Sequence, residues 1–167
     1  MPAPQIVEAD LTRPDHQAAL ISLTAAYASD PMGRGGPLPD DVLTRLVPGL
    51  AALPTSRVLL AYQDGQAVGL ATCFVGFSTF QGRPLLNVHD LFVMSPFRSR
   101  GIGRLLLDAA VAKAAELGCG RVTLEVSEKN ERARSVYEGL GFAQMGLGTP
   151  GGGVLFYARV LTHNPGP

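Results

Sequence analysis

The sequence has few cysteines, no excess of either charge and no long apolar run. Cys73 and Cys119 are the two cysteines among 167 residues. Each lies among apolar or small residues, a pattern that matches neither a disulfide scaffold nor a metal-ligand spacing. Both are expected to be reduced thiols of the core. Fourteen basic residues balance fourteen acidic ones, which gives no case for nucleic acid or an anionic membrane as a partner.

Targeting and membrane-spanning patterns are also missing. No basic segment followed by an apolar one opens the chain, so no signal peptide is expected. No window approaches the ~20 apolar residues of a membrane span. The expectation is a soluble cytoplasmic protein. Hydrophobic residues make up 46% of the chain and charged residues 17%, as in globular proteins. A chain of 167 residues suits one domain over residues 1–167 with a sizeable core.

The order of the expected elements is typical of a mixed α/β fold. Strands are predicted at residues 5–9, 58–62, 68–77, 85–94, 121–126, 142–145 and 154–160. Helices are predicted at residues 14–28, from 40 onwards, at 102–117 and at 131–140. Thr12 or Asp15 could cap the first helix, and Pro48 should bend or shorten the second. The strand, helix and strand between residues 88 and 126 imply a parallel pair with a right-handed crossover.

One stretch joins an apolar strand to an apolar helix through a basic turn. It reads Arg98-Ser99-Arg100-Gly101-Ile102-Gly103-Arg104. Free amides and the dipole at a helix start favour an anion, and the two glycines permit close approach. The turn is therefore a candidate pyrophosphate loop, although such a turn is often only a tight connection. It contains neither the P-loop motif GxxxxGK[ST] nor the dinucleotide fingerprint GxGxxG.

Two motifs together resemble the acetyl-CoA signature of the GCN5-related N-acetyltransferase (GNAT) superfamily. The first is Arg-x-x-Gly-x-Gly at residues 98–103, after a strand that ends at Val93. The second is Asn-x-x-Ala-x-x-x-Tyr-x-x-x-Gly-Phe, which runs from Asn130 to Phe142. Their order and separation are those of the superfamily. The resemblance implies the GNAT fold, an α/β (α+β) architecture with about four helices. Its mixed, mostly antiparallel sheet has about six to seven strands and a central splayed parallel pair.

The resemblance also implies acetyl-CoA (coenzyme A) as co-substrate and no metal. In the superfamily, the strand before the loop splays from its neighbour and its backbone pairs with the pantetheine arm. That role falls here on Leu91, Phe92 and Val93. The amides of the loop hold the pyrophosphate, a role that falls on Arg98, Ser99, Arg100, Gly101, Ile102, Gly103 and Arg104. Asn130 commonly contacts the cofactor arm. It is also a good helix N-cap, and both roles can hold at once.

The resemblance assigns Tyr137 as the usual general acid, which protonates the departing thiolate. Without it, Tyr137 would be a core aromatic. A backbone N–H near Val93 would stabilise the oxyanion. The base that deprotonates the amine could be His89, Asp90 or water, since histidine changes charge near neutrality. Asp90 could instead hold the amine, and both residues could be merely polar groups at a strand end. Alternation along the strand predicts that they lie on opposite faces.

The acceptor is expected over the loop of residues 30–39, where Tyr27 and Asp30 could shape a cleft that attracts a cationic amine. The acids there could equally be solvated carboxylates. The expected function is transfer of the acetyl group of acetyl-CoA directly to an amine of a small molecule or peptide. The alternative is a non-enzymatic acyl-CoA-binding or regulatory module, against which the presence of Tyr137 argues. Oligomeric state stays open, although superfamily members are often homodimers.

Overall fold

The computed structural model describes residues 2–146 and 153–162. Its elements in chain order are β1 (Gln5–Glu8), α1 (Pro14–Ser29), α2 (Asp40–Ala52), β2 (Ser56–Gln63), β3 (Gln66–Ser78), β4 (Arg83–Val93), the 3-10 turn η1 (Ser95–Phe97), α3 (Ile102–Glu116), β5 (Arg121–Ser127), α4 (Glu131–Gly139), β6 (Ala143–Gln144) and β7 (Val154–Val160). Every predicted helix and strand is present, with small shifts at the ends. Within these ranges, no helix has the length and apolar character needed to cross a membrane.

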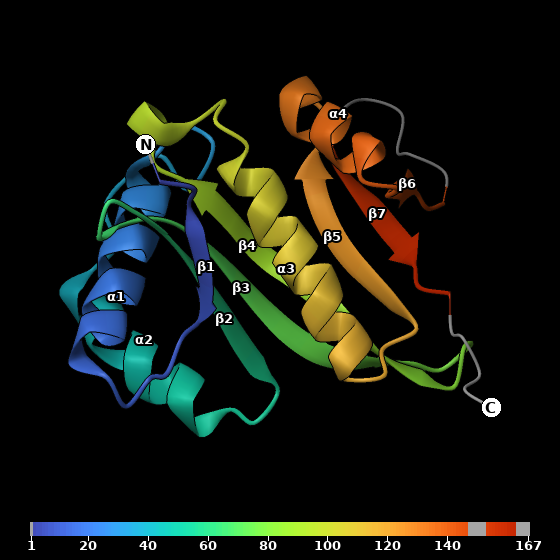
Figure 1. The fold of residues 1–167 in the computed structure, drawn as a ribbon, viewed down its shortest axis with the longest axis horizontal. Helices are drawn as coiled ribbons and strands as arrows, with labels where there is room; N and C mark the ends of the chain where they lie inside the picture. Colours follow the sequence, from blue (N-terminus) through green and yellow to red (C-terminus); the bar gives the residue numbers. More distant parts are fainter. Residues whose placement is uncertain (1, 147–152, 163–167) are drawn as a thin grey trace.

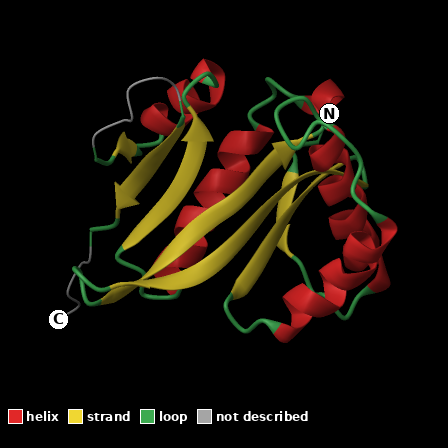
Figure 2. Ribbon diagram, turned by 180° about the vertical axis from the view of Figure 1, so that it is seen from behind, coloured by secondary structure: helices red, strands yellow, loops and turns green. Residues whose placement is uncertain are grey.

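Seven strands form one mixed sheet in the order β1-β2-β3-β4-β5-β7-β6. The central pair β4–β5 is parallel and every other neighbouring pair is antiparallel. α3 makes the crossover between β4 and β5 and lies over one face of the sheet with α4, whereas α1 and α2 lie against the other (Figures 1 and 2). The expected GNAT fold is confirmed.

Apolar helix faces account for this layering. α3 buries five side chains against the sheet: Ile102, Leu106, Leu107, Ala110 and Ala114. On the opposite face, α1 places Leu20 and Leu23 against a smaller cluster that includes Leu70 of β3 and Phe92 of β4. Burying one such leucine is worth about 1.5–3 kcal/mol. Two cores therefore hold β4 from both sides, which fixes the strand that borders the site.

The two helices at the start of the chain differ in detail from the sequence prediction. The N-cap of α1 is Arg13, without a side-chain capping hydrogen bond. Thr12 does not cap the helix because its backbone N–H and its hydroxyl both donate to Asp10, and Asp15 is paired with Arg13. Pro48 lies inside α2, which nevertheless continues to Ala52. The missing donor of one proline is therefore not enough to end that helix.

β4 carries an irregularity in front of the site. Val88 pairs with Cys73 of β3, and Asp90 pairs with Thr72, so His89 has no partner on β3. This is a β-bulge, in which one extra residue on one strand shifts the side-chain alternation. The shift explains why residues on both sides of the bulge pack into the core beneath α3: Leu86, Val88, Leu91 and Val93.

The bulge also changes the face of the sheet on which His89 and Asp90 lie. His89 lies edge-on to Phe74, with 5.5 Å between ring centroids, and Asp90 lies opposite Thr72. Phe74 and Thr72 lie on the same face of β3 as Leu70, because every second side chain of a strand shares a face. Leu70 packs toward α1. The prediction that His89 and Asp90 lie on opposite faces is therefore wrong, since it assumed a regular strand.

The parallel pair ends before either strand does. β4 and β5 pair from Leu85–Arg121 to Val88–Leu124 and no further. Beyond that point β5 continues along β7 to Ser127, whereas β4 stays with β3 and separates from β5 (Figure 1). The splayed central pair is thus confirmed, and the separation begins at the bulge.

Candidate active site

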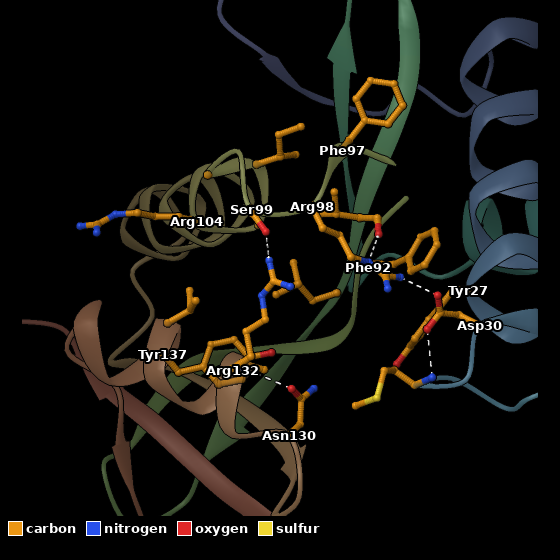
Figure 3. A pocket seen from close by; sticks show the side chains of 18 residues that line it. Tyr27, Asp30, Phe92, Phe97, Arg98, Ser99, Arg104, Asn130, Arg132 and Tyr137 are labelled. Atoms are coloured by element: carbon orange, nitrogen blue, oxygen red, sulfur yellow. Dashed lines mark hydrogen bonds and ion pairs between the residues drawn. The ribbon is translucent and has the colours of Figure 1, made fainter. Parts of the chain in front are cut away.

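A cavity of about 390 Å³ lies where β4 and β5 separate. Its walls come from the end of β4, the following loop, the first turn of α3, α4 and the end of α1 (Figure 3). A smaller cavity of about 130 Å³ continues between the two strands. Tyr27, Met32, Leu91, Asn130 and Tyr137 line both, so the two cavities share a wall.

The loop after β4 presents a run of backbone donors without partners. The N–H of Leu105 donates to the Gly101 carbonyl and begins the hydrogen bonding of α3. Before it, the amides of residues 99–104 have no backbone acceptor within the described part of the chain. The backbone is left-handed at Ser99 (φ 66°) and at Gly101 (φ 81°). Such alternation directs successive N–H groups into one concavity, which suits an anion at the positive end of a helix.

The end of β4 offers a second set of backbone groups. The N–H of Met94 donates to the Val68 carbonyl on β3 at 2.9 Å. Because a strand alternates its polar groups, Val93 and Leu91 turn their N–H and C=O toward the space that β5 has left. Phe92 turns its backbone to β3 and buries its ring toward α1. The backbone contacts predicted for residues 91–93 can therefore come from Leu91 and Val93, with Phe92 adding its ring to the wall.

Arg98 is arranged differently from the prediction. Its backbone N–H donates to Ser95. Its Nε donates to the Val93 carbonyl at 2.8 Å and its Nη2 to Oδ2 of Asp30 at 2.5 Å. The backbone amide of Arg98 is therefore engaged, and its guanidinium is directed to Val93 and Asp30 at the border of the cavity. Asp30, for the same reason, is an ion-pair partner and not a solvated carboxylate.

Three more arginines surround the loop. Arg100 lies over the ring of Phe97 at 5.4 Å and does not line the cavity. Arg104 lines it and makes a long, exposed contact of 3.9 Å with Asp108. Arg132 also lines it and donates from α4 to the hydroxyl of Ser99. The sequence analysis missed Arg132, which occupies a variable position of the second motif.

α4 brings the residues of the second motif to the cavity. Asn130 caps the helix as predicted, since its Oδ1 accepts the N–H of Ala133 at 3.1 Å. Tyr137 lies about two turns further along α4. It is 8% exposed and packs against the rings of Phe142 and Tyr157. Burial, with a smaller contribution from Tyr27, raises the pKa of Tyr137 to about 12. Its phenol is therefore protonated at any physiological pH.

The smaller cavity contains the candidates for proton removal. His89 lines it, and so does Glu125 of β5. Asp90 lines neither cavity; its half-buried carboxyl has a raised pKa because burial disfavours the charged form. Burial also raises the pKa of Tyr27, with Asp90 and Asp30 adding to the effect. Glu125 was not predicted, because it faces a cavity only where the parallel pair has come apart, a point that the sequence does not mark.

Comparison with known proteins shows which family the chain belongs to. The Acetyltransferase (GNAT) family model matches residues 22–142, so the chain belongs to the GNAT family of acetyltransferases. The uncharacterized N-acetyltransferase YhfO of Bacillus subtilis (strain 168) is 33% identical over 89 residues, which are 53% of this chain and 60% of that protein. N-alpha-acetyltransferase MAK3 of Arabidopsis thaliana is 38% identical over 85 residues, which are 50% of this chain and 43% of that protein. The chain thus spans about half the length of these relatives.

A solved structure extends the likeness to almost the whole chain. A chain of the NatC complex bound to Gag peptide and CoA superposes with a TM-score of 0.72 at 21% identity. The match covers 95% of this chain and 99% of that chain. At this identity the likeness concerns the fold. The GNAT family uses acetyl-CoA, and the CoA in this neighbour is in keeping with that use.

Proposed function

We propose that this chain is an acetyl-CoA-dependent N-acetyltransferase that transfers the acetyl group directly to an amine of a small molecule or peptide. One arrangement carries the proposal. Tyr137, the ends of Leu91 and Val93 that no longer pair with β5, and the loop residues 99 and 101–104 with their free amides all border the same cavity. Acetyl-CoA supplies an activated thioester carbonyl to such a site. The residues of the chain must bind it, orient it and handle two protons.

The residues present suit the parts of that molecule. The concavity of residues 99–104 offers N–H donors for a pyrophosphate, with the hydroxyl of Ser99 and the charges of Arg104 and Arg132 beside it. The N–H and C=O groups of Leu91 and the N–H of Val93 can pair with the amides of an extended pantetheine arm, as in strand addition, while the Val93 carbonyl accepts from Arg98. The N–H of Val93 is then placed to stabilise negative charge on the acyl oxygen. Asn130 lines the wall beside this arm.

Burial keeps the phenol of Tyr137 protonated but makes it a weaker acid. A phenol with a pKa of about 12 gives its proton only to a group of comparable basicity. Burial raises the proton affinity of sulfur as well, since it raises the pKa of the Cys73 thiol to about 12. Cys73 lies in the core and lines neither cavity, but the same effect of burial would make a thiolate released beside Tyr137 more basic than the ~8.5 of a free cysteine thiol. Donor and acceptor are thereby brought close in proton affinity.

The acceptor cleft favours a neutral or cationic amine. Among the described residues that line the smaller cavity there is no lysine or arginine, whereas Glu125 and His89 both line it. A carboxylate attracts a cationic acceptor, and either side chain is able to take the proton of an attacking amine directly or through water. Asp90 lies behind this surface, where it would act on the amine only through His89, Tyr27 or water.

An amine panel tests the proposal. L-Ornithine, spermidine and a peptide with a free N-terminus would be incubated with acetyl-CoA, and free CoA measured with a thiol-reactive dye. Cys73 and Cys119 are buried and free, and burial raises the pKa of both, so background from the protein is expected to be low. Turnover supports the proposal. A raised Tm with acetyl-CoA but no turnover favours the non-enzymatic module, and no change in Tm at saturating acetyl-CoA overturns both.

A further inference from the structure

Four residues, Tyr27, Phe92, Arg98 and Asp30, form a closed ring between the end of α1, the end of β4 and the loop that follows it (Figure 3). Tyr27 stacks on Phe92 with 5.4 Å between ring centroids and 29° between ring planes. The guanidinium of Arg98 lies 5.6 Å from the centroid of the Phe92 ring, and it donates to the carboxylate of Asp30 at 2.5 Å. Asp30 closes the ring, because its N–H donates to the carbonyl of Tyr27 at 3.1 Å.

The ion pair in this ring is shielded from water. The side chains of Arg98 and Asp30 are 32% and 12% exposed, whereas those of Arg45 and Asp41 on α2 are 72% and 71% exposed. Exposed pairs contribute little because water and salt screen them. A shielded pair that also makes a second hydrogen bond, here from Nε of Arg98 to the Val93 carbonyl, holds its two partners in one geometry.

Asp30 also organises the turn that follows α1. Its Oδ1 accepts the N–H of Met32 and its carbonyl accepts the N–H of Gly33, both at 2.9 Å. Gly33 lies so close to the Tyr27 carbonyl that a Cβ there would be 2.0 Å from the oxygen. The turn therefore cannot move toward α1, and Arg98 holds it on the side of β4. Met32 and Tyr27 face both cavities from this turn and the helix end.

We propose that Asp30 and Arg98 are positioning residues that hold the turn of residues 30–33, the acceptor-side wall, against the cofactor-binding end of β4. This rests on the proposed function. Arg98 is bound to the carbonyl of Val93, the residue whose N–H is placed to receive the acyl oxygen. The pair thus sets the spacing between the acyl group and the wall of the acceptor cleft. Breaking it loosens that wall without removing a contact to the cofactor.

Hydrogen exchange on the full chain tests the pair directly. In Asp30→Asn and Arg98→Lys, the amides of residues 30 and 32–36 should exchange about 10-fold faster or more, the effect of losing a hydrogen bond to a charged group. Lysine keeps the charge but offers no fork to reach Val93 and Asp30 together. Asp41→Asn, which removes the exposed pair with Arg45, should leave the segment unchanged. Equal exchange in wild type and both variants overturns the positioning role.

Binding and kinetics separate this inference from the function on which it rests. Calorimetric affinity for CoA should be the same in wild type and Asp30→Asn. With the panel amine that gives turnover, KM for the amine should rise in Asp30→Asn while kcat changes little, and a lower kcat at unchanged KM counts against the inference. If wild type does not bind CoA, the proposed function fails, and the exchange measurement still decides whether the pair holds the turn.

Discussion

Gly103 faces Val93 across the mouth of the loop: a methyl group on Gly103 would lie 3.8 Å from Cγ2 of Val93, an ordinary van der Waals contact. The protein itself therefore has room for a side chain at this glycine. We expect Gly103→Ala to fold normally and to gain up to about 1 kcal/mol in stability, since alanine favours a helix over glycine. Its affinity for acetyl-CoA should nevertheless fall about 10-fold, because the methyl group keeps the pyrophosphate from the amides. Thermal melting and calorimetric titration measure the two effects.

Gly49→Ala is the matched control for this substitution. Gly49 lies in α2, and a methyl group there would meet nothing within 4 Å. It should stabilise the chain in the same way and leave acetyl-CoA binding as it is. Equal affinity in wild type and Gly103→Ala would show that no ligand comes close to this part of the loop.

The hydroxyl of Tyr137 should matter for turnover and little for binding. We expect Tyr137→Phe to lower kcat about 100-fold, a usual loss when a general acid is removed, with acetyl-CoA affinity almost unchanged. Tyr62→Phe is the control, because the hydroxyl of Tyr62 is buried without a partner among the described residues. Removing that group should leave kcat alone. Steady-state kinetics with a saturating amine distinguish the two, and a fully active Tyr137→Phe would reduce Tyr137 to a core aromatic.

The raised pKa of Asp90 predicts an effect on stability. Burial makes the folded state bind the proton of Asp90 more tightly than the unfolded chain. The charged carboxyl therefore costs stability above the folded pKa, and that cost disappears as the pH falls below the usual value of ~3.9. Asp90→Asn should thus raise Tm at neutral pH, by an amount that shrinks on acidification. Melting curves across pH measure this, and a lower Tm at neutral pH would show that the charged form is needed for folding.

The carboxylate of Asp30 should stabilise the fold at neutral pH, opposite to that of Asp90. The Met32 amide and the Arg98 guanidinium hold the pKa of Asp30 below its ordinary value. The stability that it contributes is fully present above the unfolded pKa of ~3.9 and is lost as the pH falls through the folded pKa. Asp30→Asn should therefore lower Tm at neutral pH, and the difference from wild type should close in acid. A difference that persists unchanged in acid would contradict the ion pair as its source.

Sequence reasoning located the fold because the two motifs and the apolar periodicity of α3 are local patterns. The cap at Asn130 and the crossover between β4 and β5 depend on neighbours in the chain, and the structure confirms them. The free amides of residues 99–104 follow from the same local logic, since a helix start always leaves donors without partners.

The rest depends on contacts between segments far apart in the sequence. Nothing near Arg98 in the chain indicates that its guanidinium meets Asp30, 68 residues earlier. Arg132 and Glu125 become site residues because α4 and β5 border the same cavity as the loop. The prediction that His89 and Asp90 lie on opposite faces was wrong because a bulge leaves no recognisable pattern in a run of strand-forming residues.

The bulge at His89 divides β4 into two stretches in which the alternation of side chains between the two faces of the sheet is shifted by one residue. Before His89, one set of positions supplies side chains to the core beneath α3; after it, the other set does, and so the amides of Leu91 and Val93 are the ones directed away from β3. A point substitution in β4 leaves this shift in alternation in place, because the shift depends on the number of residues in the strand and not on their chemistry. Deleting His89 would remove the extra residue and leave a regular strand in which Leu91 and Val93 keep the faces that they have now, although β4 would reach the loop one residue sooner.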